Sequence, residues 1–174
     1  MKSLYFSGFC LENEEELFSS YRVKNDFTIS GFSYGAIKAF QYTLEALKNN
    51  QRVDKLQLFS PAYFNNESKK FKRLQLMFFK KDENEYKNNF IKNTIFPNNN
   101  CINKYISIGT YEELDILLNY QWEEKDLQIL LDANIKIEVF IGANDKIVDS
   151  NSAKEFFRQF GEVYFIKDVG HSLN

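Results

Sequence analysis

A serine, a histidine and an aspartate of this sequence have the types and the chain order that acyl-transfer chemistry needs. Ser33 lies between two glycines in Gly31-Phe32-Ser33-Tyr34-Gly35, a G-x-S-x-G pattern. In this pattern a strand turns so sharply into a helix that the serine is held in a strained conformation above the sheet. Glycines are needed on both sides because the turn brings backbone against backbone. Ser33 is therefore the predicted nucleophile.

A base must accompany this serine, because a hydroxyl is a weak nucleophile at its own pKa. The sequence contains one histidine, His171, in Val169-Gly170-His171-Ser172 after the last predicted strand. Parallel strands present their carboxyl ends at one edge of a sheet, so His171 is expected near Ser33. A lone histidine is more often a packed or surface residue, but the serine pattern favours a catalytic one.

A carboxylate should hold the imidazole in one tautomer and stabilise its charged form. Asp145 follows a predicted strand in Gly142-Ala143-Asn144-Asp145 and keeps the chain order Ser, Asp, His. Asp149 and Asp168 are alternatives, although Asp149 suits the start of the next helix and Asp168 suits a turn.

Two backbone N–H groups are predicted to stabilise the oxyanion that forms next to Ser33. One is the N–H of Tyr34, at the start of the helix after the serine. The other is the N–H of Phe9, in the loop Ser7-Gly8-Phe9-Cys10 after the first strand. Cys10 is expected to be a small buried packing residue, since no second histidine exists to activate its thiol.

The elements that must position these residues follow from apolar periodicity. Helices are predicted over residues 12–21, 34–48 and 125–133, and a further helix is expected to be capped by Ser152 with Glu155. Strands are predicted over residues 4–6, 27–29, 56–59, 135–141 and 163–166. Strands that alternate with helices favour an α/β fold with a mainly parallel sheet of about five strands, covered on both faces.

The segment from about residue 64 to residue 121 is predicted to be a helical insertion, whose last helix starts at a capping box of Thr110 with Glu113. Between Phe64 and Lys104 there are nine basic and four acidic residues, a net charge of +5, while the rest of the chain carries −7. This asymmetry indicates an acidic partner, or else a solvated helix face.

Bulk properties narrow the class further. A chain of 174 residues fits one domain spanning residues 1–174, and 44% apolar content excludes a disordered chain. No secretory signal or membrane span is recognisable, and Cys10 and Cys101 suit a reducing compartment, so a soluble cytoplasmic protein is expected. A net charge of −2 argues against a nucleic-acid partner, and one histidine argues against a metal site. No cofactor is predicted.

Through Gly31-Phe32-Ser33-Tyr34-Gly35, Gly142-Ala143-Asn144-Asp145 and Gly170-His171, the sequence resembles esterases of the α/β-hydrolase fold over most of its length. Its small size and the stretch Phe6-Ser7-Gly8-Phe9-Cys10 are similar to those of the short BioV-type pimeloyl-acyl carrier protein methyl ester esterases of biotin synthesis. About twenty residues separate the oxyanion loop from Ser33, which implies an abbreviated α/β-hydrolase fold with the helical insertion as a lid.

The resemblance implies a pimeloyl chain with a methyl ester at one end and an acyl carrier protein at the other. Ser33 would attack the methyl ester, Phe9 and Tyr34 would stabilise the oxyanion, and His171 would protonate the departing methanol. In the lid, basic residues could attract the acidic carrier while apolar residues line a channel for the acyl chain. The basic set is Lys69, Lys70, Lys72, Arg73, Lys80 and Lys81, and the apolar set is Phe71, Leu74, Met77 and Phe78. These aromatics could equally be the core of the lid.

Two other functions fit the same residues. The first is a general small carboxylesterase or thioesterase, because acyl-transfer chemistry is shared and specificity depends on the lid. The second is a non-catalytic module that binds an acyl carrier protein on a hydrolase scaffold, although such a module has no need of all three catalytic residue types in order.

Overall fold

The computed structural model describes residues 3–98 and 102–174, and within them five strands form one sheet in the order β1-β2-β3-β4-β5. Every neighbouring pair is parallel. The strands are β1 (Leu4–Phe6), β2 (Thr28–Phe32), β3 (Lys55–Phe59), β4 (Lys136–Gly142) and β5 (Glu162–Ile166). The predicted parallel sheet of about five strands is therefore confirmed. Cys101 lies outside the described residues.

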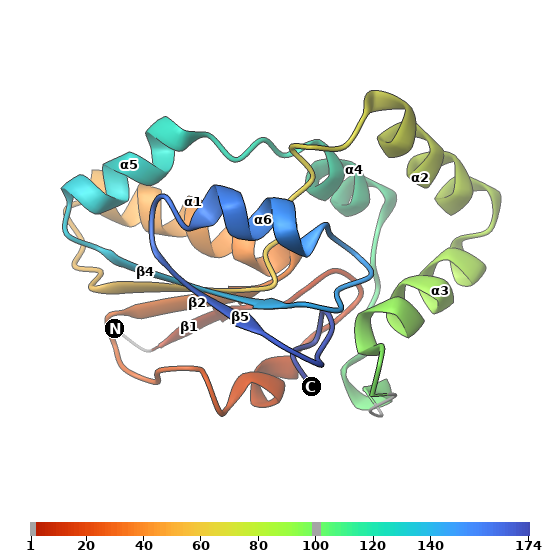
Figure 1. The fold of residues 1–174 in the computed structure, drawn as a ribbon, viewed down its shortest axis with the longest axis horizontal. Coiled ribbons are helices and arrows are strands. Elements are labelled where there is room, and N and C mark those ends of the chain that lie inside the picture. Colours follow the sequence, from red (N-terminus) through yellow and green to blue (C-terminus); the bar gives the residue numbers. More distant parts are fainter. Residues whose placement is uncertain (1–2, 99–101) are drawn as a thin grey trace.

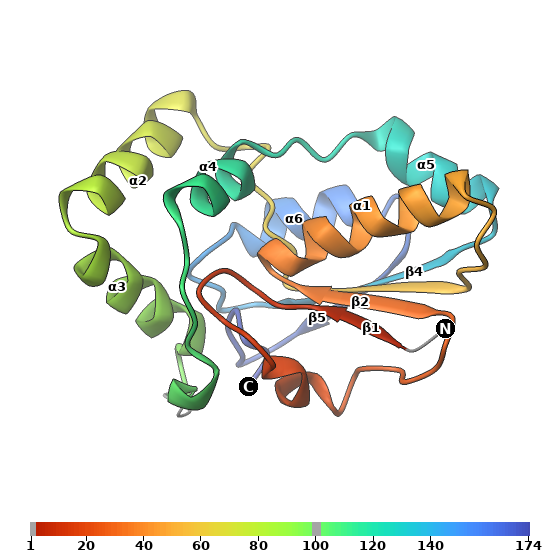
Figure 2. The same cartoon turned by 180° about the vertical axis from the view of Figure 1, so that it is seen from behind.

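Amphipathic helices connect the strands. They are α1 (Tyr34–Lys48), α2 (Lys69–Lys81), α3 (Glu83–Ile95), α4 (Tyr111–Asn119), α5 (Glu124–Asp132) and α6 (Ser150–Phe157). Helices α1, α5 and α6 lie on the same face of the sheet, as Figures 1 and 2 show from opposite sides. The predicted start of α6 at a Ser152 cap is wrong, because Asp149 caps this helix and accepts from the N–H groups of Asn151 and Ser152.

The opposite face of the sheet is covered as well, although it carries no α-helix in the described part of the chain. The predicted helix over residues 12–21 is a short 3-10 helix, η1 (Glu14–Phe18), because the left-handed conformation of Asn13 interrupts it. Phe18 is fully buried from this helix, with its ring 4.7 Å from that of Phe59 and 4.8 Å from that of Phe32. These aromatic rings form a second core beneath the sheet.

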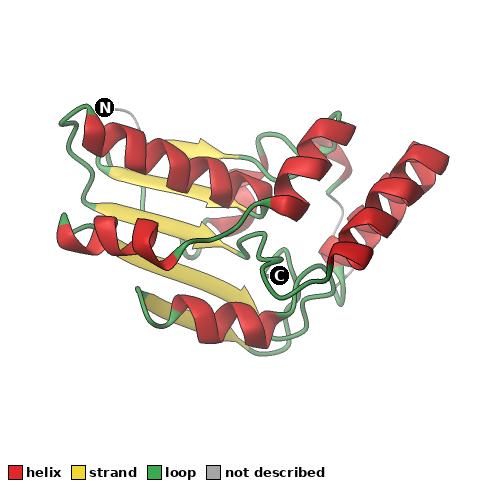
Figure 3. Cartoon of the chain, turned by 90° about the horizontal axis from the view of Figure 1, so that it is seen from above, coloured by secondary structure: helices red, strands yellow, loops and turns green. Residues whose placement is uncertain are grey.

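Between β3 and α5 the chain is helical, as expected for the insertion. Helices α2, α3 and α4 and the short 3-10 helix η2 (Asn103–Tyr105) belong to it. Thr110 and Glu113 form the predicted capping box of α4. Helices α2 and α3 stand beyond the carboxyl ends of the strands (Figures 1 and 3), where the loops with the candidate site residues emerge. None of the helices described is long and apolar enough to cross a lipid bilayer.

Candidate active site

The turn that carries Ser33 is strained in the way the sequence pattern requires. Ser33 has φ 54° and ψ −114°, a region that non-glycine residues enter at a cost of about 1–3 kcal/mol. A Cβ added at Gly31 would lie 2.1 Å from the carbonyl oxygen of Gly35, and one at Gly35 would lie 1.9 Å from that of Phe6. Both glycines are thus needed for close approach of the backbone, and β1 passes directly against the turn.

Three side chains meet at the carboxyl edge of the sheet. The Nε2 atom of His171 lies 2.8 Å from Ser33 Oγ, and its Nδ1 atom lies 2.6 Å from Asp145 Oδ2. The imidazole is fully buried and the serine is 3% exposed. Such geometry allows the ring to take the serine proton while the carboxylate holds Nδ1–H and offsets the positive charge that develops.

Asp145 is fixed by its own loop. Its Oδ1 atom accepts hydrogen bonds from the N–H groups of Ile147 at 2.7 Å and Val148 at 3.0 Å, which leaves Oδ2 directed at the histidine. The alternatives have other roles. Asp149 caps α6, and the resulting hydrogen bonds hold the pKa of its carboxyl below the usual value. Asp168 lies in a turn with φ 62°.

The loop after β1 passes beside this site. Phe9 is 1% exposed, and neither its N–H nor that of Tyr34 donates a hydrogen bond to another described residue. Backbone N–H groups that have no acceptor in the described part of the chain are free to bind an oxyanion. Cys10 is 2% exposed, and burial raises the pKa of its thiol to about 12, as suits a packing residue.

Two residues of the site were not identified from the sequence. Ser60, after β3, has φ 40° and donates a 2.6 Å hydrogen bond from its hydroxyl to the carbonyl oxygen of His171, so it fixes the histidine loop. Glu14 is fully buried and accepts from the N–H of Gly8, next to Phe9. The Ser60-Pro61 strand exit could have drawn attention to the first, whereas Glu14 sits among acidic residues of similar appearance.

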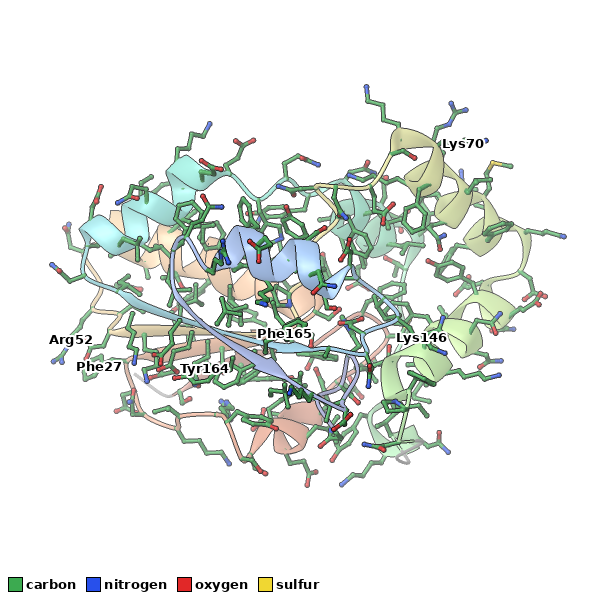
Figure 4. All side chains as sticks on the ribbon, in the orientation of Figure 1. Phe27, Arg52, Lys70, Lys146, Tyr164 and Phe165 are labelled. Atoms are coloured by element: carbon green, nitrogen blue, oxygen red, sulfur yellow. The ribbon has the colours of Figure 1, made fainter. Side chains whose placement is uncertain are left out.

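A cavity of about 220 Å³ lies between α2, α3 and α4 beside the site. Its lining includes Ile147, which follows Asp145 closely, and Phe90, whose ring meets that of Phe9 edge-on at 5.2 Å. Lys146 also lines it, with Nζ 3.4 Å from the ring centroid of Phe96, on the side that faces α3 (Figure 4). Ligand sites usually have about 300–1,000 Å³, so this cavity suits a narrow chain.

The residues predicted to line an acyl channel divide into two groups. Phe71 lines the cavity. Leu74, Met77 and Phe78 do not, and their exposed fractions are 36%, 61% and 53%. The expectation of one continuous channel along α2 is therefore not met, because the buried side of this helix carries Lys72 and Phe79, whereas most of the predicted apolar set lies on its exposed side.

The basic residues of α2 also divide. Lys69, Lys70, Arg73, Lys80 and Lys81 are exposed, and Lys70 extends away from the sheet (Figure 4). Lys72 is only 6% exposed, and burial lowers the pKa of its ammonium group. Lys72 is thus not available on the outer surface with the others. Within residues 3–98 and 102–174, no group of three His, Cys, Asp or Glu side chains is arranged to hold a metal ion.

No family model and no curated protein matches this sequence. Its structure resembles naproxen esterase (carboxylesterase NP) from Bacillus subtilis, with a TM-score of 0.63 and 14% identity over 98% of this chain and 76% of that chain. MGS-M2, an alpha/beta hydrolase enzyme from a Medee basin deep-sea metagenome library, gives a TM-score of 0.64 and 14% identity over 97% of this chain and 82% of that chain. BioG from Haemophilus influenzae gives a TM-score of 0.59 and 13% identity over 97% of this chain and 87% of that chain.

These likenesses show the fold. The chain has an abbreviated α/β-hydrolase fold, as its sequence resemblance implied. It spans only 54% and 57% of the length of two further hydrolase structures from Bacillus subtilis that it matches.

Proposed function

We propose that this chain is a serine carboxylesterase that hydrolyses the methyl ester of pimeloyl-acyl carrier protein methyl ester, giving pimeloyl-acyl carrier protein and methanol. The observation that carries the proposal is the hydrogen-bonded series from Ser33 Oγ through His171 to Asp145, at 2.8 Å and 2.6 Å. A hydroxyl, a base and a carboxylate in this geometry are the parts of a nucleophilic acyl-transfer site. The carboxylesterase and hydrolase folds that the chain resembles agree with this chemistry.

In the first half of the proposed reaction, Ser33 Oγ attacks the carbonyl carbon of the methyl ester as His171 Nε2 takes its proton. The carbonyl oxygen becomes an oxyanion, which the N–H groups of Phe9 and Tyr34 would bind. His171 then gives the proton to the methoxy oxygen, so methanol leaves and the acyl group remains on the serine. Asp145 stabilises the imidazolium throughout.

The second half releases the acid. A water molecule gives a proton to His171 and attacks the acyl-serine carbonyl, a second oxyanion forms at the same N–H groups, and the serine leaves with the proton from the imidazolium. No residue changes its net protonation over the cycle, so the protein's own residues suffice and no cofactor is part of the proposal.

The shape and charge around the site support an acyl chain attached to an acidic partner. The narrow cavity lined by Phe71, Phe90 and Leu117 would take the acyl chain. The exposed cations of α2 would attract an acidic carrier, and Met77 and Phe78 would offer it apolar contact. A cytoplasmic enzyme is part of the proposal, in keeping with two cysteines far apart in the sequence.

A general carboxylesterase or thioesterase remains the main rival, because the same three side chains would serve a small free ester. The ratio of kcat/KM for the carrier-bound methyl ester to kcat/KM for a free short-chain methyl ester separates the two functions. A ratio well above one supports the carrier-dependent enzyme, and a ratio near or below one supports the general esterase.

The proposal is tested by incubating methyl-pimeloyl carrier protein with the wild type and with Ser33→Ala, followed by intact-mass spectrometry of the carrier. The wild type should remove one methyl group and leave the thioester intact, whereas Ser33→Ala should leave the mass unchanged. Release of the whole acyl group would identify a thioesterase. Binding of the carrier without any mass change would identify a non-catalytic module.

A further inference from the structure

The loop that carries Phe9 is held in a conformation that it would not adopt alone. Cys10 and Asn13 both have positive φ, 60° and 58°, and a non-glycine residue in this region costs about 1–3 kcal/mol. The far side of the loop is tied to the insertion. The N–H of Ser107 donates to the carbonyl oxygen of Cys10 at 2.8 Å, and the N–H of Glu12 donates to that of Tyr105 at 2.8 Å.

The near side of the loop is tied to a buried carboxylate. Glu14 Oε1 accepts a 2.8 Å hydrogen bond from the N–H of Gly8 and a 2.9 Å hydrogen bond from the hydroxyl of Tyr5. Burial, and then the Glu14 charge, raise the pKa of Tyr5 well above its usual value, so the phenol keeps the proton that it donates. Glu14 thereby connects the first strand with the loop that follows it.

These contacts set the direction of the Phe9 N–H. The carbonyl oxygen of Gly8 accepts from the N–H of Leu11 at 3.2 Å, while the N–H of Gly8 is bound to Glu14. In a trans peptide the C=O and the N–H of one unit point in opposite directions. Holding both polar groups of Gly8 therefore leaves the Phe9 N–H pointing away from Leu11, without an acceptor among residues 3–98 and 102–174.

Folding stability alone does not account for this carboxylate. Glu14 is fully buried, and its Oε2 atom has no hydrogen-bond partner in the described part of the chain. Arg22, whose guanidinium lies 5.2 Å from the ring centroid of Tyr5, pairs with Glu15. A buried carboxylate with an unsatisfied oxygen destabilises a fold relative to an apolar side chain of similar size.

We propose that Glu14 is a positioning residue of the oxyanion hole, which aims the Phe9 N–H at the reacting carbonyl by holding the N–H of Gly8. This inference rests on the proposed acyl-transfer function. Loss of an oxyanion donor lowers kcat by about 10²–10³, so partial misalignment of one donor should cost about 10-fold to 100-fold. Substrate binding in the ground state should hardly change.

The test compares Glu14→Leu, Glu14→Gln and the wild type with p-nitrophenyl butyrate as substrate. Glu14→Leu should lower kcat by about 10-fold to 100-fold with KM within about twofold, because leucine fills the space but accepts no hydrogen bond. Glu14→Gln keeps an amide oxygen that can accept from both the Gly8 N–H and the Tyr5 hydroxyl, so its kcat should lie within about threefold of the wild-type value. The matched control is Glu16→Gln, on the same short helix, whose exposed side chain pairs with Lys104.

A second measurement separates this role from a merely structural one. A trifluoromethyl ketone forms a tetrahedral oxyanion adduct with an active serine, so Glu14→Leu should weaken its affinity by the same factor as kcat. If Glu14→Leu does not fold, Glu14→Asp takes its place, since its side chain keeps the charge but is one methylene too short to reach the Gly8 N–H. This variant should lower kcat at least fivefold, as expected for a small misplacement of the Phe9 N–H.

Folded Glu14→Leu or Glu14→Asp with the wild-type kcat and ketone affinity would overturn the inference while leaving the proposed function intact. A change in KM alone would overturn it too. A wild type that neither removes the methyl group of methyl-pimeloyl carrier protein nor binds the ketone would overturn the proposed function, and the inference with it.

Discussion

At the scale of single residues, the candidate site depends on hydrogen bonds that fix the orientation of its side chains. His171 receives its orientation from Asp145 on one ring nitrogen and from the Ser60 hydroxyl on its carbonyl oxygen. The ring of Phe32 packs 5.1 Å from the imidazole and excludes water from that side. The proposed base is therefore held in place in the resting protein, which would reduce the reorganisation that the proposed reaction requires.

Asp145→Asn tests this orientation. The asparagine oxygen would take over the hydrogen bonds from Ile147 and Val148, which turns the amide NH₂ toward His171 Nδ1 and favours the wrong tautomer. We expect kcat for p-nitrophenyl butyrate to fall about 10³-fold to 10⁴-fold with little change in KM.

The matched control is Asp149→Asn, at the cap of the next helix. It should lower the free energy of unfolding by less than about 1 kcal/mol and leave kcat nearly unchanged. Equal losses of kcat in the two variants would contradict the assignment of Asp145.

At the scale of elements, the turn between β2 and α1 depends on close packing of backbone. Gly35→Ala would place a Cβ 1.9 Å from the Phe6 carbonyl oxygen, and neither strand nor helix can move away without loss of hydrogen bonds. We expect the free energy of unfolding to fall by about 3 kcal/mol or more, measured by urea denaturation. Gln41→Ala, at an exposed position of α1, should change it by less than about 0.5 kcal/mol. Similar stabilities of the two variants would argue against the tight turn.

A second element-scale prediction concerns α2. Reversing two exposed charges with Lys70→Glu and Arg73→Glu should raise KM for the carrier-bound methyl ester at least about tenfold at low salt. The effect should shrink as ionic strength rises, because exposed charges are screened. The same reversal at Lys125, exposed on α5, should have little effect. An equal response to both sets of changes would argue against docking on α2.

The sequence predicted correctly those elements that are determined by residues close together in the chain. The strand, turn and helix around Ser33 follow from glycine spacing and helical apolar periodicity, and the capping box at Thr110 needs only residues three apart. The roles of Glu14 and Lys72 were not predictable in the same way. Each resembles its exposed neighbours in the sequence, and only the folded structure distinguishes it from them by its burial.

At the scale of the whole molecule, each strand of the sheet contributes one residue to the same edge. Phe9 follows β1, Ser33 follows β2, Ser60 follows β3, Asp145 follows β4 and His171 follows β5. Parallel strands in sequential order bring five distant loops together, so a small sheet suffices for the site. On the face of the sheet that carries no α-helix among the described residues, polar side chains of β3 and β4 hydrogen-bond to one another. A side chain of β4 lies at the centre of this network.

Glu138 is that side chain, and it makes stability depend on pH. Burial raises the pKa of its carboxyl, but hydrogen bonds from Lys55 at 2.7 Å and Gln57 at 2.8 Å outweigh this effect, so the folded-state pKa lies below its usual 4.5. The stabilisation is present above pH 4.5 and is lost as pH falls through the folded-state value.

Glu138→Gln should therefore lower the free energy of unfolding by about 1–3 kcal/mol at pH 7. The difference from the wild type should shrink below pH 4.5, as followed by denaturant titrations across pH. Glu162→Gln, whose carboxylate is half exposed, should change stability by less than about 1 kcal/mol. A difference for Glu138→Gln that is constant across pH would contradict this account.

The central claim is that Ser33 is a nucleophile activated by His171, and covalent labelling with a fluorophosphonate tests it most directly. Intact-mass spectrometry should show one adduct on the wild type, and peptide mapping should locate it at Ser33. Ser33→Ala should remain unlabelled, and His171→Ala should react at least about 10³-fold more slowly. A wild type that stays unlabelled, or a Ser33→Ala variant labelled as fast as the wild type, would contradict the claim.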